Sequence, residues 1–234
     1  MNHNSIINRI VVFAPHPDDD ILGCGGSLAG HIEKGHIVKI VYLTSGESGS
    51  IEIGKAALGG LREVEARSAA RILGVEQTDF LRWPDGYLTV QREYLRQLTS
   101  LIRAEKPHRV YLPHSQDAVS DHLVTHQLVM EAIRRAAGPW YQECPGEPWT
   151  VATVLGYEVW TPIAAPGIAI DISAFMDRKL AALREHQSQL IGYAYDEAIT
   201  GLNRYRAVMN SRCQYCECFQ LLKITSLMDQ PAYD

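Results

Sequence analysis

Residues 9–20 read RIVVFAPHPDDD, an apolar run followed at once by two prolines, a histidine and three aspartates. The run from Arg9 to Ala14 is short, continuous and rich in β-branched residues, which is typical of a strand buried on both faces of a sheet. The prolines at 15 and 17 stiffen the turn that follows. We therefore expect the polar side chains from His16 to Asp20 to occupy fixed positions at the end of a core strand.

The segments downstream alternate between strand-like and helix-like patterns. Further strands are predicted over Ile37–Leu43, Thr78–Leu81, Arg109–Leu112, Thr153–Trp160 and Ile168–Ile172. Helices are predicted over Ile21–Lys34, Leu61–Leu73, Gln91–Glu105, Asp121–Ala137 and Phe175–Ile191. This alternation indicates an α/β fold, a Rossmann-like three-layer sandwich with a mostly parallel sheet. Such sheets bind their ligands beyond the carboxyl ends of the strands.

Composition narrows the class of protein further. With 46% hydrophobic and 21% charged residues, the 234-residue chain is able to bury a sizeable core, and no linker or repeat divides it, so residues 1–234 are expected to form a single domain. The net charge of -5 and the lack of a basic stripe argue against nucleic acid as a partner. No apolar run reaches the roughly 18 residues of a membrane span, and no signal-peptide layout is visible, so a cytoplasmic location is expected.

The five cysteines are odd in number and unevenly spaced, which fits free thiols in a reducing compartment rather than a disulfide framework. Three of them form the pattern Cys213-x-x-Cys216-x-Cys218. A structural metal site would need a fourth ligand and a second CxxC, and neither is present. We therefore expect small buried thiols.

Histidine and aspartate gather in two of the predicted strand-end loops. One holds His16, Asp18 and Asp19, and the other, Pro113–His122, reads PHSQDAVSDH. Imidazole and carboxylate groups are natural ligands of zinc and similar divalent metals, and a catalytic zinc usually has three protein ligands. Helix capping alone would need one aspartate, not three beside a histidine. We expect both loops to share one metal.

The second loop leads into a predicted helix. Asp121 is expected to cap this helix, which places His122 in the first turn, facing the site. His126 lies one turn further on the same face, but the HExxH pattern of zinc-binding helices is absent, so a surface or core role is expected for it.

Several motifs, in order along nearly the whole chain, resemble the PIG-L family of zinc-dependent deacetylases, also called LmbE-like. The HPDD motif and the glycine-rich GCGG stretch after it come first. The matching segments are His16–Asp19, Gly23–Gly26, Thr44–Glu47, Arg62–Arg67, Leu73–Val75, Pro113–His122, Lys179–Gln189 and Tyr215–Phe219.

The resemblance implies a set of roles. His16, Asp19 and His122 would bind Zn²⁺, with Fe²⁺ or another divalent metal possible, and Asp18 would be the general base. Support or substrate-binding roles fall to Asp20, Arg62, His114 and Asp121. The implied reaction removes the acetyl group from an N-acetylglucosamine-type amino sugar or its conjugate. A small-molecule substrate and a homo-oligomeric assembly follow from the same resemblance.

One position departs from the family pattern. Many members carry a histidine where this chain has Val119, and that histidine stabilises the oxyanion or acts as an acid. His114, another residue or the metal alone would then supply this function. The departure also keeps open an alternative, a sugar-binding or regulatory protein with a degenerate site.

The residues around these motifs allow further interpretations. A dinucleotide-binding site is disfavoured because position 28 is leucine rather than the last glycine of GxGxxG, and because three carboxylates would repel a pyrophosphate.

Arg62 is expected to pair with nearby glutamates or to touch substrate. The loop from Thr44 to Gly60 is long enough for a lid or a substrate wall. Side chains that would face a sugar ring, or else pack in the core, are Trp83, Asp85, Tyr157 and Glu158.

Overall fold

The computed structural model describes residues 7–210 and 213–225. Its strands are β1 (Arg9–Ala14), β2 (Ile37–Tyr42), β3 (Gln77–Phe80), β4 (Arg109–Pro113), β5 (Thr153–Tyr157), β6 (Ile168–Asp171) and β7 (Cys216–Ile224). Its helices are α1 (Asp19–Glu33), α2 (Lys55–Leu73), α3 (Arg92–Glu105), α4 (Ser120–Ala136), α5 (Met176–Leu183), α6 (Gln187–Leu190) and α7 (Tyr195–Asn210), with a 3₁₀ turn at Ser173–Phe175.

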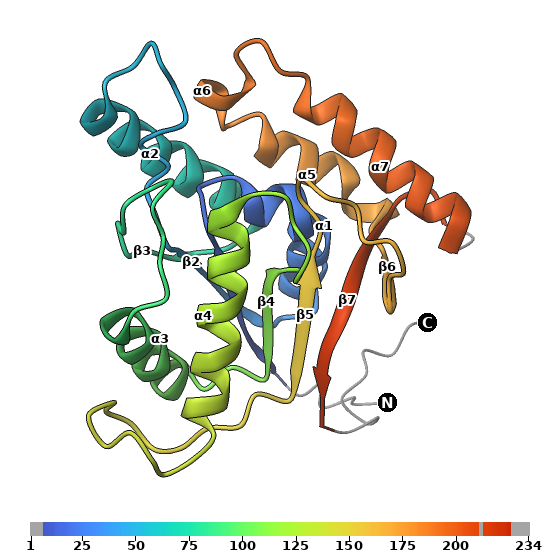
Figure 1. The fold of residues 1–234 in the computed structure, drawn as a ribbon. Coiled ribbons are helices and arrows are strands. Elements are labelled where there is room, and N and C mark those ends of the chain that lie inside the picture. The colour runs from blue at the N-terminus through green and yellow to red at the C-terminus, as the bar shows by residue number, and fades with distance from the viewer. Residues whose placement is uncertain (1–6, 211–212, 226–234) are drawn as a thin grey trace.

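The strands form one sheet in the order β3-β2-β1-β4-β5-β7-β6 (Figure 1). The first five in this order pair in parallel, and only β7 runs antiparallel to its neighbours. The predicted mostly parallel, Rossmann-like sheet is therefore confirmed. The chain moves from β1 outward to β3 and then returns to β4 on the other side of β1. Beyond the carboxyl ends of β1 and β4, this reversal leaves the crevice in which open α/β sheets bind ligands.

Helices cover both faces of the sheet, which explains why β1 is apolar at every position after Arg9. Ile10 and Val12 belong to the core cluster under α1, α2 and α5, whereas Val11 and Phe13 belong to the cluster under α3 and α4. Successive strand residues point to opposite faces, so a strand covered on both sides shows no polar alternation. Figure 1 shows α3 and α4 on the near side of the sheet.

Several boundaries differ from those expected. Helix α2 begins at Lys55, inside the predicted loop, and β5 ends at Tyr157. The single helix predicted over 175–191 is wrong, since the chain forms α5 and α6 with a break at residues 184–186. Helix α7 and strand β7 were not predicted. Cys216 and Cys218 on β7 are buried free thiols, as expected, whereas the free thiol of Cys213 is only partly buried.

None of the helices in residues 7–210 and 213–225 combines the length and apolar character needed to cross a bilayer.

The glycine-rich stretch after the first loop is a break in α1. Cys24 has non-helical dihedral angles, φ −146° and ψ 15°, so a second helical segment starts beyond it. The carboxylate of Glu217 accepts hydrogen bonds from the backbone amides of Gly26 (2.9 Å) and Ser27 (2.8 Å), as a helix N-terminus requires. Lys179 donates to the Leu22 carbonyl (2.9 Å), the other group freed by the break.

Close packing explains two of these glycines. A Cβ atom at Gly23 would lie 2.3 Å from the Tyr157 ring, and one at Gly26 would lie 2.7 Å from Ile172. The glycines, Lys179 and Glu217 thus form one structural unit that sets the position of the first turn of α1. That turn carries the aspartates of the HPDD motif.

We expect Lys179→Met to lower the free energy of unfolding by about 3–5 kcal/mol, because the Lys179–Glu217 ion pair (2.7 Å) is fully buried and one charge would be left unpaired. Urea unfolding of wild type and variant measures the change. The double variant Lys179→Met/Glu217→Gln should lose less than the sum of the two single losses. A loss below about 1 kcal/mol for Lys179→Met would contradict this account of the break.

Candidate active site

The HPDD segment lies at the carboxyl end of β1, where α1 begins. Asp18 is the residue before α1 and has φ 142°, a backbone conformation that is rare for any residue except glycine. Its carbonyl accepts the backbone amides of Ile21 and Leu22, both at 2.9 Å. The strained turn brings the side chains of residues 16–19 over the end of the sheet, beside the loop that follows β4.

Three side chains from these two loops converge. Asp19 Oδ2 lies 3.1 Å from His16 Nδ1 and 3.3 Å from His122 Nε2. His122 is in the first turn of α4, as predicted, and its side chain is fully buried. Neither of its ring nitrogens makes a hydrogen bond of good geometry within the described residues. Two imidazole nitrogens and a carboxylate oxygen within 4.8 Å of one another fit a divalent metal, which would satisfy these groups.

Further carboxylates lie beside the other ring nitrogen of each histidine. His16 Nε2 lies 3.1 Å from Asp85 and 3.3 Å from Asp121, and His122 Nδ1 lies 3.5 Å from Asp117. Carboxylates in this position fix the orientation and the tautomer of metal-binding histidines.

His16, Asp85 and Asp121 also lie close enough together to hold a metal. However, Asp121 already accepts the backbone amides of Gly86 (2.7 Å) and Leu88 (3.2 Å), and Asp85 accepts that of Ser48 (2.7 Å). These two carboxylates are better suited to receive the His16 N–H. The prediction that Asp121 caps α4 is wrong: the residue before α4 is Val119, with no side-chain cap, and Asp121 turns toward the neighbouring loop instead.

Arg62 on α2 lies against the remaining carboxylate of the motif. Its Nη2 is 3.1 Å from Asp18 Oδ2, and its guanidinium also donates to the carbonyls of Pro17 (2.8 Å) and Gly46 (3.0 Å). Burial raises the pKa of Asp18 to about 7, while the positive charge of Arg62 acts in the opposite direction. The expectation that Arg62 pairs with nearby glutamates is wrong. Glu63 pairs instead with Arg82.

Asp20 and His114 lie further from the open site. Asp20 is buried and accepts a hydrogen bond from the Tyr42 hydroxyl (3.0 Å), and burial raises its pKa to about 7. His114 is also buried. Its Nε2 donates to the Thr161 carbonyl (2.8 Å) and its Nδ1 accepts the Gln116 amide (3.3 Å). Both ring nitrogens of His114 are thus occupied by backbone groups.

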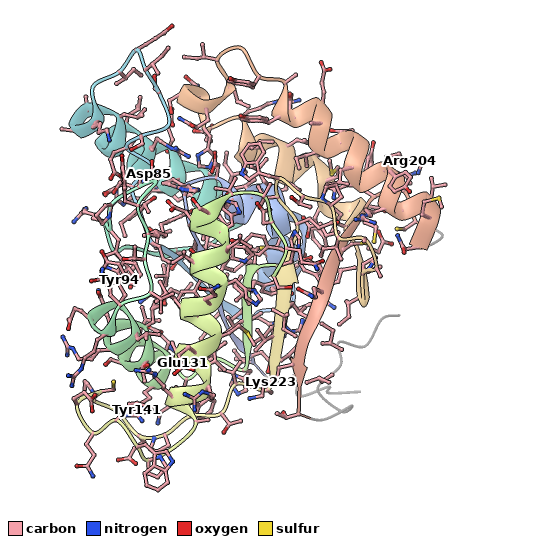
Figure 2. All side chains as sticks on the ribbon, in the orientation of Figure 1. Asp85, Tyr94, Glu131, Tyr141, Arg204 and Lys223 are labelled. Atoms are coloured by element: carbon pink, nitrogen blue, oxygen red, sulfur yellow. The ribbon has the colours of Figure 1, made fainter. Side chains whose placement is uncertain are left out.

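A cavity of about 660 Å³ opens over this group. Its lining includes His16, Asp18, Asp19, Arg62, Asp85 and Val119, the loop residues 48–53, and Trp160, Ser188, Gln189, Ile191, Tyr193 and Tyr195. The long loop after β2 therefore forms a wall, as one of its predicted roles requires. Figure 2 labels Asp85 in the upper part of the molecule and Tyr141 near its lower end.

Of the four side chains considered for a sugar ring, only Asp85 lines the cavity. Trp83 stacks on Tyr94, the Tyr157 hydroxyl donates to the Phe13 carbonyl, and Glu158 pairs with Arg206. The aromatic residues that do line the cavity were missed in the sequence. A signal was present, because the helix predicted up to Ile191 is followed directly by the aromatic cluster YAY at 193–195.

The family described as GlcNAc-PI de-N-acetylase, PIG-L, matches residues 11–133. An uncharacterized deacetylase, YaiS of Escherichia coli K12, is 32% identical over 76% of this chain and 90% of its own. The diacetylchitobiose deacetylase of Thermococcus kodakarensis is 29% identical over 78% of this chain and 70% of its own.

Two solved structures show the same fold. The conserved protein TT1542 from Thermus thermophilus has a TM-score of 0.85 and 32% identity, over 97% of this chain and 100% of its own. GalB, the 4-carboxy-2-hydroxymuconate hydratase from Pseudomonas putida KT2440, has a TM-score of 0.81 and 25% identity, over 96% and 100%. The family match covers more than half of the chain, and two of these four proteins are 32% identical to it. The chain therefore belongs to the PIG-L family.

Proposed function

We propose that this protein is a metal-dependent deacetylase that removes the acetyl group from an N-acetylglucosamine-type amino sugar or its conjugate. The observation that carries the proposal is the convergence of His16, Asp19 and His122 beside the Asp18 carboxylate, at an open cavity. The name of the Thermococcus relative, a diacetylchitobiose deacetylase, supports the substrate class.

The metal would be held by His16, Asp19 and His122, and we propose zinc. Two imidazoles and one carboxylate also suit iron(II), so metal analysis decides the identity. A divalent ion bound there would supply Lewis-acid chemistry, making water more acidic and drawing electrons from an amide carbonyl. Asp85, Asp117 and Asp121 hold the two histidines in the orientation that this requires.

Asp18 is the proposed general base. It lines the cavity without belonging to the three-residue metal group, so its carboxylate is free to take a proton from the attacking water. A base with a pKa near the working pH transfers protons efficiently. The charge of Arg62 favours the ionised form of Asp18, and a cation bound by the three ligands would favour it as well. The same carboxyl group then returns the proton to the nitrogen of the leaving amine as the C–N bond breaks.

Val119 lines the cavity where many family members have a histidine. Its side chain has no donor, and His114 is held by backbone groups. Neither residue therefore stabilises the negative charge on the carbonyl oxygen.

The direct test is metal content together with acetate release from a panel of N-acetylglucosamine derivatives. We expect about one metal per chain, loss of acetate release on chelation to below roughly 1% of the starting rate, and recovery on adding zinc, because a catalytic metal supplies several kcal/mol of transition-state stabilisation. No metal uptake would contradict the central claim.

A metal-bound protein that binds amino sugars but releases no acetate would favour the alternative, a sugar-binding or regulatory protein. The Pseudomonas hydratase, similar over nearly the whole chain, also makes addition of water to a conjugated carbon–carbon double bond worth assaying in that case.

Three further features remain proposals. The five free cysteines support a cytoplasmic location. The single domain over residues 1–234 and the homo-oligomer stay predictions, and a measurement of molecular mass in solution tests the assembly.

A further inference from the structure

Three aromatic side chains form a cluster in the wall of the active-site cavity. Trp160 follows β5, Tyr193 precedes α7, and Tyr195 is the first residue of α7. The rings of Tyr193 and Tyr195 are nearly parallel, with centroids 5.4 Å apart, and Trp160 meets Tyr195 edge-on at 5.5 Å. Trp160 is 43% exposed and Tyr193 is 63% exposed. The two outer rings of the cluster therefore present surface to the cavity and to solvent.

The cluster is tied to the reacting groups from one side through Asp117. One oxygen of this carboxylate lies 3.5 Å from Nδ1 of His122, and the other accepts the backbone amide of Trp160 at 3.1 Å. A single buried side chain thus sets the position of the tryptophan relative to the metal group.

The other side is anchored on α2. The amide and hydroxyl of Ser188 donate to Glu65 at 2.8 Å and 2.7 Å. Glu65 lies three residues from Arg62, whose guanidinium holds Asp18. The segment that leads to the two tyrosines is therefore fixed to the same helix as the partner of the base. The two anchors connect the cluster to elements that carry the reacting groups, an arrangement able to orient a substrate for reaction.

Polar side chains also line the cavity around the cluster. These are Ser48, Ser50, Glu52, Ser188 and Gln189. An aromatic face flanked by hydroxyl, carboxylate and amide groups matches a ring with an apolar face and hydroxyl groups on its edges, which describes a sugar. Ile51, Ile53 and Ile191 line the cavity too and would suit an alkyl chain, but such a chain would leave the polar groups without partners.

We propose that Trp160, Tyr193 and Tyr195 bind a second sugar ring linked to the acetylated unit, so that the protein prefers a disaccharide to a monosaccharide. The proposal rests on the deacetylase function proposed above. The cavity, about 660 Å³, is within the range of roughly 300–1,000 Å³ found for sites that take drug-sized ligands. Binding of a remote ring would also help to place the acetamido group beside Asp18.

Binding is measured calorimetrically in an Asp18→Asn background, so that turnover does not interfere. The probes are N-acetylglucosamine, N,N′-diacetylchitobiose and octyl N-acetylglucosaminide. We expect the disaccharide to bind about 10-fold tighter than the monosaccharide, because the apolar face of its second ring is buried against the aromatic side chains. Adding Trp160→Ala or Tyr193→Ala should remove most of this difference and change monosaccharide affinity less than about 3-fold.

Trp140→Ala is the matched control, since Trp140 is an exposed tryptophan between α4 and β5, at the opposite end of the sheet. It should keep the disaccharide preference. Thermal melting shows whether each variant folds. Because Trp160→Ala and Tyr193→Ala are made separately, the test still works if one of them fails to fold.

Equal affinity for monosaccharide and disaccharide, or no binding of any probe, would overturn the proposal. A preference that survives both Trp160→Ala and Tyr193→Ala would do the same. Tighter binding of the octyl glycoside than of the disaccharide would also overturn the proposal, because it would show that the aromatic cluster prefers an alkyl chain to a second sugar ring. Acetate release by the wild-type protein is measured separately, so disaccharide preference without release would contradict the proposed function and leave the second-ring site standing.

Discussion

Replacing Asp18 by asparagine is expected to lower kcat for acetate release by roughly 10³-fold, within the range that general bases contribute. Asparagine has nearly the same shape but cannot take up the proton. Asp18 lines the cavity, and the Arg62 guanidinium at 3.1 Å fixes its position. The three-residue metal group does not include Asp18, so metal content should stay near that of the wild-type protein. Initial rates and metal analysis on the same preparation give both quantities.

The control for this substitution is Asp177→Asn, on the exposed surface of α5. It removes the same charge from the protein and should leave kcat within about 2-fold of wild type, since it touches nothing in the site. If Asp18→Asn kept more than about a tenth of the wild-type rate, another group would have to be the base.

The predictable parts of the fold carry local signals in the sequence, which do not depend on which residues they contact in the folded protein. Strand β1 was predicted with the bounds that the structure gives, because Ile10–Ala14 are all apolar and buried. The αL residue Gly74, with φ 86°, ends α2 where the sequence indicated. Patterns of this kind are readable because burial of apolar side chains is independent of the particular neighbour.

The missed elements bury polar side chains through specific partners. Of the buried residues of α7, Asn203 donates to the Cys216 carbonyl and Arg206 pairs with Glu158. In β7, Glu217 is buried because Lys179 and the broken end of α1 surround it. From the sequence alone, these polar residues are expected to be exposed. The hydrophobic periodicity that would identify a helix or a strand is therefore absent at these positions.

The same reasoning applies to the site. The convergence of His16, Asp19 and His122 was predictable because carboxyl ends of parallel strands share one edge of the sheet. The role of Asp121 was not, because the helix-cap preference of aspartate competes with a contact to His16 that only the tertiary structure creates. Likewise, nothing local indicates that Arg62 reaches Asp18, 44 positions earlier in the chain.

Replacing His122 by alanine is expected to remove both the metal and the activity. His122 supplies one of the three ligand atoms, and its ring is fully buried. Loss of an outer partner of a metal ligand alone costs roughly 10–100-fold in affinity, so loss of a ligand should weaken metal binding by more than about 100-fold. Dialysed protein should then contain little metal, and acetate release should fall to background.

His126→Ala is the matched control, one turn further along α4. Its ring nitrogen interacts with the Pro113 carbonyl (2.9 Å) and it belongs to neither metal-binding group of the described residues. We expect this variant to keep its metal and most of its activity, whereas His122→Ala loses both. If instead His122→Ala retained stoichiometric metal while His126→Ala lost it, the metal ligand from α4 would be His126. The arrangement around Asp19 would then have to be revised, because His122, and not His126, is the α4 histidine whose ring lies beside the Asp19 carboxylate.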